Sequence, residues 1–133
     1  GALKKFKPSQ KKIKQELESA RNDLAEANDR FSYQKYKYAT INSYYSLFHS
    51  ARTLLYIVGY REKSHRCLKI AVEELYIKEK ILPPKFVEYF EESMGLREAA
   101  DYQSLFSKNG AERGITAAKE FLKVAKEVVK EQL

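Results

Sequence analysis

The side chains best suited to chemistry follow Gly59 in a short run: Arg61, Lys63, Ser64 and His65. They stand at or just before the expected start of a helix, where free backbone N–H groups and the positive end of the helix dipole favour anions. Histidine acts as a general acid or base near neutral pH, and arginine can hold a phosphate through two hydrogen bonds. A metal-independent ribonuclease needs these groups, because a proton must leave a 2′-hydroxyl while negative charge grows on the phosphate.

A second polar stripe lies in the preceding segment, where spacings of three and four place its members on one helix face. Its members are Asn42, Tyr45, His49, Arg52 and Tyr56. Arg52 stands between apolar neighbours, so its guanidinium needs either an anionic ligand or an acidic side chain on a neighbouring helix, such as Asp101 or Glu98. His49 is either part of a binding site or a neutral core histidine hydrogen-bonded to a backbone or tyrosine oxygen.

Candidate roles follow from these two groups. The candidate catalytic residues are His65 and Arg61. The candidate nucleic-acid or phosphate contacts are Arg52, His49, Lys63, Ser64 and Arg66. No metal ligands are predicted, because the chain has two histidines, one cysteine and not the two Glu-x-x-His motifs that a helical di-iron site uses.

The charge is unevenly distributed along the chain. The formal net charge is +7, and the first acidic residue, Glu16, follows six lysines: Lys4, Lys5, Lys7, Lys11, Lys12 and Lys14. A second basic cluster surrounds His65, whereas residues 73–101 are rich in glutamate. This polarity favours an anionic partner such as RNA; the alternative is that the lysine-rich start is a solvated tail.

Five amphipathic helices must position these residues. Apolar spacing and capping residues predict helices over about 9–31, 33–58, 64–80, from Pro84 to about Asp101 with a kink or restart near Gly95, and 115–131. Ser9 and Ser64 are the expected N-caps of the first and third helices, and Gly59 is expected to end the second. Residues 103–114, with two glycines, are predicted to be a loop, and no segment alternates as a strand would. The chain therefore divides into a basic tail over residues 1–8 and one all-α domain over 9–133, an up-and-down bundle of four to five helices.

Several function classes lack their sequence signals. No run of apolar residues is long enough to cross a membrane, and no apolar signal segment follows the basic start, so a cytoplasmic location is expected. No glycine-rich phosphate loop is present, and no cofactor is predicted. One cysteine, Cys67, cannot form an internal disulfide.

Two longer stretches carry a family resemblance. They are A-T-I-N-S-Y-Y-S-L-F-H-S-A-R-T-L-L with G-Y-R-E-K-S-H after it, and L-R-E-A-A-D-Y followed by a loop and A-A-K-E-F-L. Over roughly residues 10–130 the chain resembles small stand-alone HEPN-domain proteins of bacteria and archaea. The resemblance implies a HEPN-like helical bundle, commonly a homodimer, and in many members a toxin paired with a small nucleotidyltransferase antitoxin.

The resemblance also implies a reaction. Active members are similar to metal-independent endoribonucleases with an arginine, four to six intervening residues and a histidine near the start of the third helix. Here His65 takes the place of that histidine, but Arg61 is separated from it by three residues and Arg52 by twelve.

Two functions therefore stay open. The first is RNA binding or metal-independent RNA cleavage by a dimer, with His65 as acid or base and Arg61 or Arg52 on the phosphate. The tyrosines expected to stack on unpaired bases are Tyr44, Tyr45, Tyr56 and Tyr60. The second is a non-catalytic interaction module that binds a nucleotidyltransferase partner or a nucleotide. A structural dimer without a ligand is a third alternative.

Overall fold

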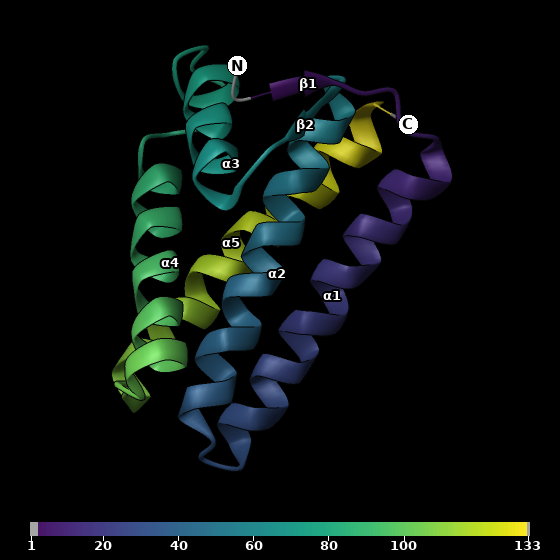
Figure 1. Ribbon diagram of the computed structural model, residues 1–133. Helices are drawn as coiled ribbons and strands as arrows, with labels where there is room; N and C mark the ends of the chain where they lie inside the picture. The colour runs from purple at the N-terminus through teal and green to yellow at the C-terminus, as the bar shows by residue number, and fades with distance from the viewer. Residues whose placement is uncertain (1–2, 133) are drawn as a thin grey trace.

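The computed structural model describes residues 3–132. Its helices are α1 (Gln10–Ser32), α2 (Tyr36–Ile57), α3 (His65–Val72), α4 (Lys85–Gln103) and α5 (Lys108–Gln132) (Figure 1). Two short strands, β1 (Leu3–Lys5) and β2 (Tyr60–Glu62), lie at one end of the bundle. The predicted all-α fold of four to five helices is confirmed.

Side-chain caps define two of the helix starts. Ser9 accepts a hydrogen bond from the Lys12 amide at the start of α1, and Ser64 accepts one from the Cys67 amide at the start of α3. Each cap satisfies a backbone donor that has no partner inside the helix. Gly59, just after α2, has a φ of +85°, a conformation that glycine adopts without strain. The predicted role of Gly59 in ending this helix is therefore confirmed.

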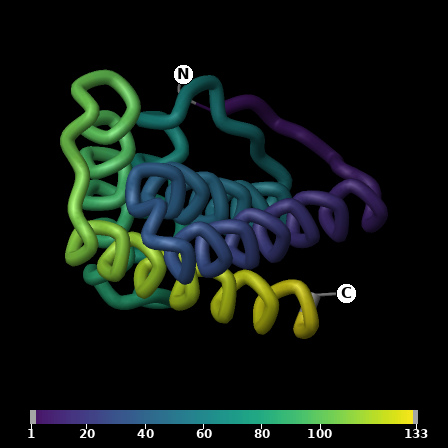
Figure 2. The backbone as a smooth tube through the Cα atoms, turned by 90° about the horizontal axis from the view of Figure 1, so that it is seen from below, coloured from purple at the N-terminus to yellow at the C-terminus, as the bar shows by residue number. Residues whose placement is uncertain are grey.

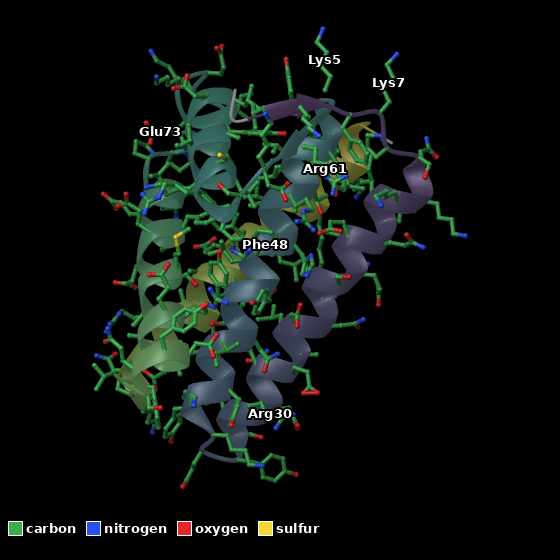
Figure 3. All side chains as sticks on the ribbon, in the orientation of Figure 1. Lys5, Lys7, Arg30, Phe48, Arg61 and Glu73 are labelled. Atoms are coloured by element: carbon green, nitrogen blue, oxygen red, sulfur yellow. The ribbon has the colours of Figure 1, made fainter. Side chains whose placement is uncertain are left out.

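The absence of strands was predicted wrongly. β1 and β2 pair antiparallel, with Lys4 opposite Arg61. The ribbon continues into a backbone hydrogen bond of 2.9 Å from Phe6 to Gly59. Three-residue strands are too short to show alternation in a sequence. The ribbon attaches the lysine-rich start to the end of α2, and Lys5 and Lys7 point away from the bundle (Figure 3).

The helix boundaries differ from prediction at three places. α5 begins at Lys108, so the predicted loop over 103–114 is wrong for its second half; Ser107 caps this helix by accepting from the Gly110 amide. The expected kink near Gly95 is absent, since α4 runs unbroken through it. After Val72 the third helix widens into a π-helical turn over Glu73–Ile77.

α2 is the central element of the bundle. It packs against α1, α4 and α5, which enclose it in Figure 2. Gly114 of α5 approaches Ser43 of α2 so closely that an added Cβ would lie 2.6 Å from the Ser43 Oγ. The glycine that indicated a loop instead allows two helices to approach each other.

We predict that Gly114→Ala lowers the free energy of unfolding by about 1–3 kcal/mol, because the new methyl group overlaps a buried hydroxyl. Adding Ser43→Ala should recover part of that loss, since the overlapping oxygen is removed. Gly95→Ala is the matched control: no atom lies within 4 Å of its added Cβ, so a gain of about 0.5–1 kcal/mol is expected from helix propensity. Urea unfolding measures all four proteins, and equal effects at both glycines would contradict the close approach.

Candidate functional site

Arg52 of α2 is held by two carboxylates. Its Nε and Nη2 donate to the Glu62 Oε2 at 2.8 and 2.5 Å, and its Nη1 donates to the Glu16 Oε1 at 3.3 Å. The guanidinium also lies over the Phe48 ring, 4.5 Å from the centroid. The sequence correctly indicated an ion pair as one alternative, but the acids come from β2 and α1. The suggested partners Asp101 and Glu98 are wrong.

His49 belongs to the same set of charges. Its Nδ1 lies 2.5 Å from the Glu16 Oε1 and its Nε2 lies 3.7 Å from the Asp23 Oδ2. Burial raises the pKa of Asp23. Burial would also raise the pKa of Glu16, but the hydrogen bond and charge of His49 and the charge of Arg52 bring it below its usual value. We call these five residues the Arg52 network: Arg52, Glu62, Glu16, His49 and Asp23.

Three carboxyl groups surround Arg52 and His49 in the Arg52 network. The Arg52 guanidinium is paired with Glu62 and Glu16, the His49 ring lies against Glu16 and Asp23, and Glu62 is almost fully buried. A phosphate arriving at Arg52 or His49 would meet those carboxylates, and like charges repel at such range. The structure therefore places Arg52 and His49, two of the predicted phosphate contacts, in a structural network between α1, α2 and β2.

His65, the first residue of α3, lies on an aromatic surface. Its ring stacks on Phe48 at 4.2 Å and on Tyr44 at 5.6 Å between centroids, and Phe48 marks this part of the molecule in Figure 3. Its Nδ1 lies 2.5 Å from the Tyr44 hydroxyl. Burial lowers the pKa of His65, and the positive charges of Arg97 and Arg52 lower it further. The ring is therefore neutral at neutral pH.

The Tyr44 hydroxyl determines which nitrogen of His65 carries the proton. Tyr44 is fully buried, and burial raises the pKa of its hydroxyl well above the usual value, so the hydroxyl keeps its proton. Among the described residues its one hydrogen-bond partner is the His65 Nδ1. A buried donor without an acceptor is unfavourable, so Tyr44 donates to Nδ1. The proton of the neutral imidazole is then on Nε2, which makes that nitrogen a hydrogen-bond donor.

Arg97 of α4 is a candidate site residue that the sequence analysis missed. Its Cζ lies over the rings of Tyr44, Tyr45 and Tyr102 at 5.6, 5.5 and 5.6 Å from their centroids. Its Nη2 donates to the Tyr45 hydroxyl at 3.0 Å and lies 3.5 Å from the Asp101 carboxylate. Its Nε is buried and has no hydrogen-bond partner within the described residues.

Tyr44 brings Arg97 and His65 together, because both pack on its ring. We call the five residues His65, Tyr44, Tyr45, Arg97 and Tyr102 the His65–Arg97 cluster. Arg97 and Tyr102 lie in L-R-E-A-A-D-Y, the stretch that carried part of the family resemblance. The family resemblance therefore indicated this stretch from the sequence. The packing of α4 against α2, which places Arg97 beside Tyr44, could not be read from it.

The remaining predicted site residues lie outside the His65–Arg97 cluster, and one of them, Ser64, caps α3. Arg61 is exposed and lies over the Phe6 ring, 5.7 Å from its centroid, because alternation along β2 turns Glu62 inward and Arg61 outward. The Ser64 hydroxyl caps α3. Lys63 and Arg66 are exposed on either side of His65 in the chain. Tyr56, expected among the stacking tyrosines, is buried in the core.

We predict that the pKa of His65, followed by NMR titration of its ring protons, lies below the ordinary value of about 6.5. Arg97→Gln should raise it, because the Arg97 charge is removed. A depressed folded-state pKa contributes stability above the unfolded-state pKa, and that contribution is lost as the pH falls through the folded-state pKa. A ¹H–¹⁵N spectrum should show the proton on Nε2. A proton on Nδ1, or no response to Arg97→Gln, would contradict the geometry.

Comparisons with known proteins agree with this fold. The family model described as HEPN domain matches residues 13–130. The crystal structure of TT1696 from Thermus thermophilus is 17% identical, with a TM-score of 0.73 over 91% of this chain and 98% of that one. ST0689, an archaeal HEPN homologue, is 18% identical, with a TM-score of 0.63 over 88% and 97%. No curated protein sequence matches. The predicted family is confirmed: the chain belongs to the HEPN domain family.

Proposed function

We propose that this chain binds single-stranded RNA through the His65–Arg97 cluster. One observation carries the proposal: His65 and Arg97 both pack on the ring of Tyr44, so a neutral N–H donor and a guanidinium border the same side chain. Donors of these two kinds suit the phosphate oxygens of an RNA backbone. In the Arg52 network two carboxylates hold the guanidinium, whereas Arg97 has one ion-pair partner among the described residues, the exposed Asp101 at 3.5 Å.

The aromatic side chains around Arg97 favour unpaired RNA. Tyr102 is 74% exposed although its ring lies against the Arg97 guanidinium. An exposed ring beside a phosphate contact can stack on a base, which single strands present and duplexes hide. Exposed Lys63 and Arg66 beside His65 in the chain add attraction for the backbone.

Metal-independent RNA cleavage is a second candidate, and the lowered pKa of His65 favours it. A neutral imidazole at neutral pH is a form that can accept a proton. Accepting the 2′-hydroxyl proton at Nε2 would require the ring proton to lie on Nδ1 instead. The Nδ1–H would then donate to the Tyr44 oxygen, and the buried Tyr44 hydroxyl proton would lose its acceptor. Binding needs no such rearrangement, so it is the function that the geometry supports better.

We predict that His65→Ala and Arg97→Ala each weaken binding of a fluorescent single-stranded oligonucleotide about tenfold or more, because each removes a hydrogen bond to a charged group. His65→Gln keeps an N–H donor in a similar place, so it should retain most of the affinity. Fluorescence anisotropy at fixed, stated salt measures these constants in EDTA, and the same samples on a gel report cleavage.

Arg61→Ala is the matched control, since it removes the same charge from the β2 ribbon. Equal loss of affinity in Arg61→Ala and Arg97→Ala would contradict the proposed site. Cleavage by the wild type that disappears in His65→Gln while binding persists would establish the ribonuclease candidate. Intact RNA throughout would leave binding as the function.

The homodimer, the toxin role and the nucleotidyltransferase partner stay predictions. No helix within residues 3–132 is long and apolar enough to cross a membrane. We expect light scattering to give twice the mass of one chain. A monomer at high concentration would exclude a site shared between two copies, whereas RNA binding at the His65–Arg97 cluster needs one copy only.

A further inference from the structure

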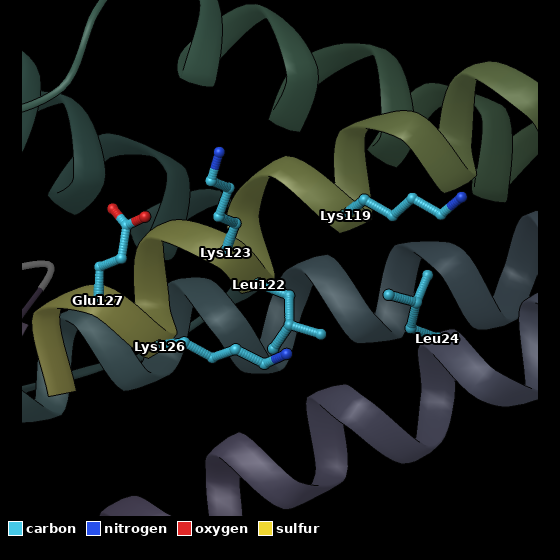
Figure 4. Close-up of a pocket in the computed structure, with 6 residues that line it drawn as sticks. All are labelled: Leu24, Lys119, Leu122, Lys123, Lys126 and Glu127. Atoms are coloured by element: carbon cyan, nitrogen blue, oxygen red, sulfur yellow. The ribbon is translucent and has the colours of Figure 1, made fainter. Parts of the chain in front are cut away.

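A groove runs between α1 and α5, along a seam that the His65–Arg97 cluster does not use. One part of it, a cavity of about 360 Å³, is lined by Leu24, Leu122, Glu127 and three lysines of α5, which surround it in Figure 4. A neighbouring cavity of about 320 Å³ shares Lys119 and continues past Phe31 and Ile115. We call the two together the α1–α5 groove.

The floor of the groove is apolar and its rim is cationic. The floor consists of Leu24 and Phe31 from α1 and Ile115 and Leu122 from α5. The rim lysines are Lys119, Lys123 and Lys126, exposed and spaced by four and three residues along one side of α5. None of the three has an ion-pair partner within the part of the chain that the structure describes.

The length and charge of the groove specify an occupant. Its α5 side extends from Glu112 to Glu127, or about 22 Å at the rise of an α-helix. A helix of about 15 residues has that length and presents an apolar stripe to a groove of this kind. The unpaired lysines lie between the two glutamates, so the complementary helix is acidic over its central turns. Nucleic acid fits less well, because bases stack on aromatic side chains and three of the four floor residues are aliphatic.

We propose that the α1–α5 groove binds an acidic amphipathic helix of a partner protein. The apolar stripe of that helix covers Leu24 and Leu122, and its central carboxylates pair with Lys119, Lys123 and Lys126. This surface is separate from the proposed RNA site, since none of its lining residues belongs to the His65–Arg97 cluster. The protein can therefore hold RNA and a partner at the same time.

The test uses a fluorescein-labelled peptide of about 15 residues, with leucines at helical spacing and glutamates flanking them in the central turns. Anisotropy with the full chain should give a dissociation constant in the micromolar range, of order 1–100 μM. The triple variant Lys119→Glu, Lys123→Glu, Lys126→Glu should bind at least about tenfold more weakly, because three attractions become repulsions. These side chains are exposed and unpaired, so the variant is expected to fold, and circular dichroism checks this.

The control variant is Lys35→Glu, Lys80→Glu, Lys108→Glu, which makes the same change in net charge at three exposed lysines outside the groove. It should retain wild-type affinity within about twofold. A second peptide, with serine at every leucine position, keeps the charges and should bind at least about tenfold more weakly, because the apolar contact is lost.

Three outcomes overturn the proposal. The first is no binding of the leucine peptide at about 1 mM. The second is equal binding of the serine peptide, which would make the groove a simple polyanion surface. The third is displacement of the peptide by single-stranded RNA whose own affinity falls in the groove variant, which would assign the groove to RNA. Arg97→Ala should leave peptide binding unchanged, so failure of the RNA proposal is distinguishable from failure of this one.

Discussion

The half-buried guanidinium of Arg52 imposes the constraint on which the local structure depends. A cation among apolar side chains is unfavourable unless carboxylates compensate it, and here Glu62 and Glu16 do so from β2 and α1. These contacts join three elements at one end of the bundle. They turn Glu62 inward, which turns Arg61 outward, and β2 leads directly into Ser64 and the start of α3. The position of His65 therefore depends on an ion pair that lies outside the candidate site.

The aromatic side chains of α2 contact both Arg52 and the residues of the His65–Arg97 cluster. Phe48 carries the Arg52 guanidinium and also stacks on His65, while Tyr44 contacts His65 and Arg97. The aromatic side chains of α2 therefore lie between the Arg52 network on one side and Arg97 on the other. The Arg52 network is closed by acids, whereas Arg97 retains a buried Nε without a partner among the described residues. The two arginines have similar aromatic surroundings, but two carboxylates hold Arg52, whereas Arg97 has one, the exposed Asp101 at 3.5 Å. Arg97 is therefore the better candidate for a ligand contact.

Much of this arrangement was predictable from local sequence, and the rest depends on tertiary contact. Long apolar periodicities and the capping serines Ser9 and Ser64 predicted the helices. The sequence also correctly predicted that His65 lies at the start of a helix. The β1–β2 ribbon was missed because three residues carry no measurable alternation. Gly114 was interpreted as a loop residue, but a close helix approach requires it. Arg97 was missed because no local rule shows which face of α4 packs against Tyr44.

The chain has two histidines, one in the Arg52 network and one in the His65–Arg97 cluster, so a single experiment separates the two sites. The measurement is a ¹H–¹⁵N spectrum of the imidazole rings recorded while a single-stranded oligonucleotide is added. The account predicts that the His65 Nε2–H resonance shifts with saturation as RNA binds, while the His49 resonances, held between Glu16 and Asp23, stay in place. A shift of His49 with no change at His65 would contradict it.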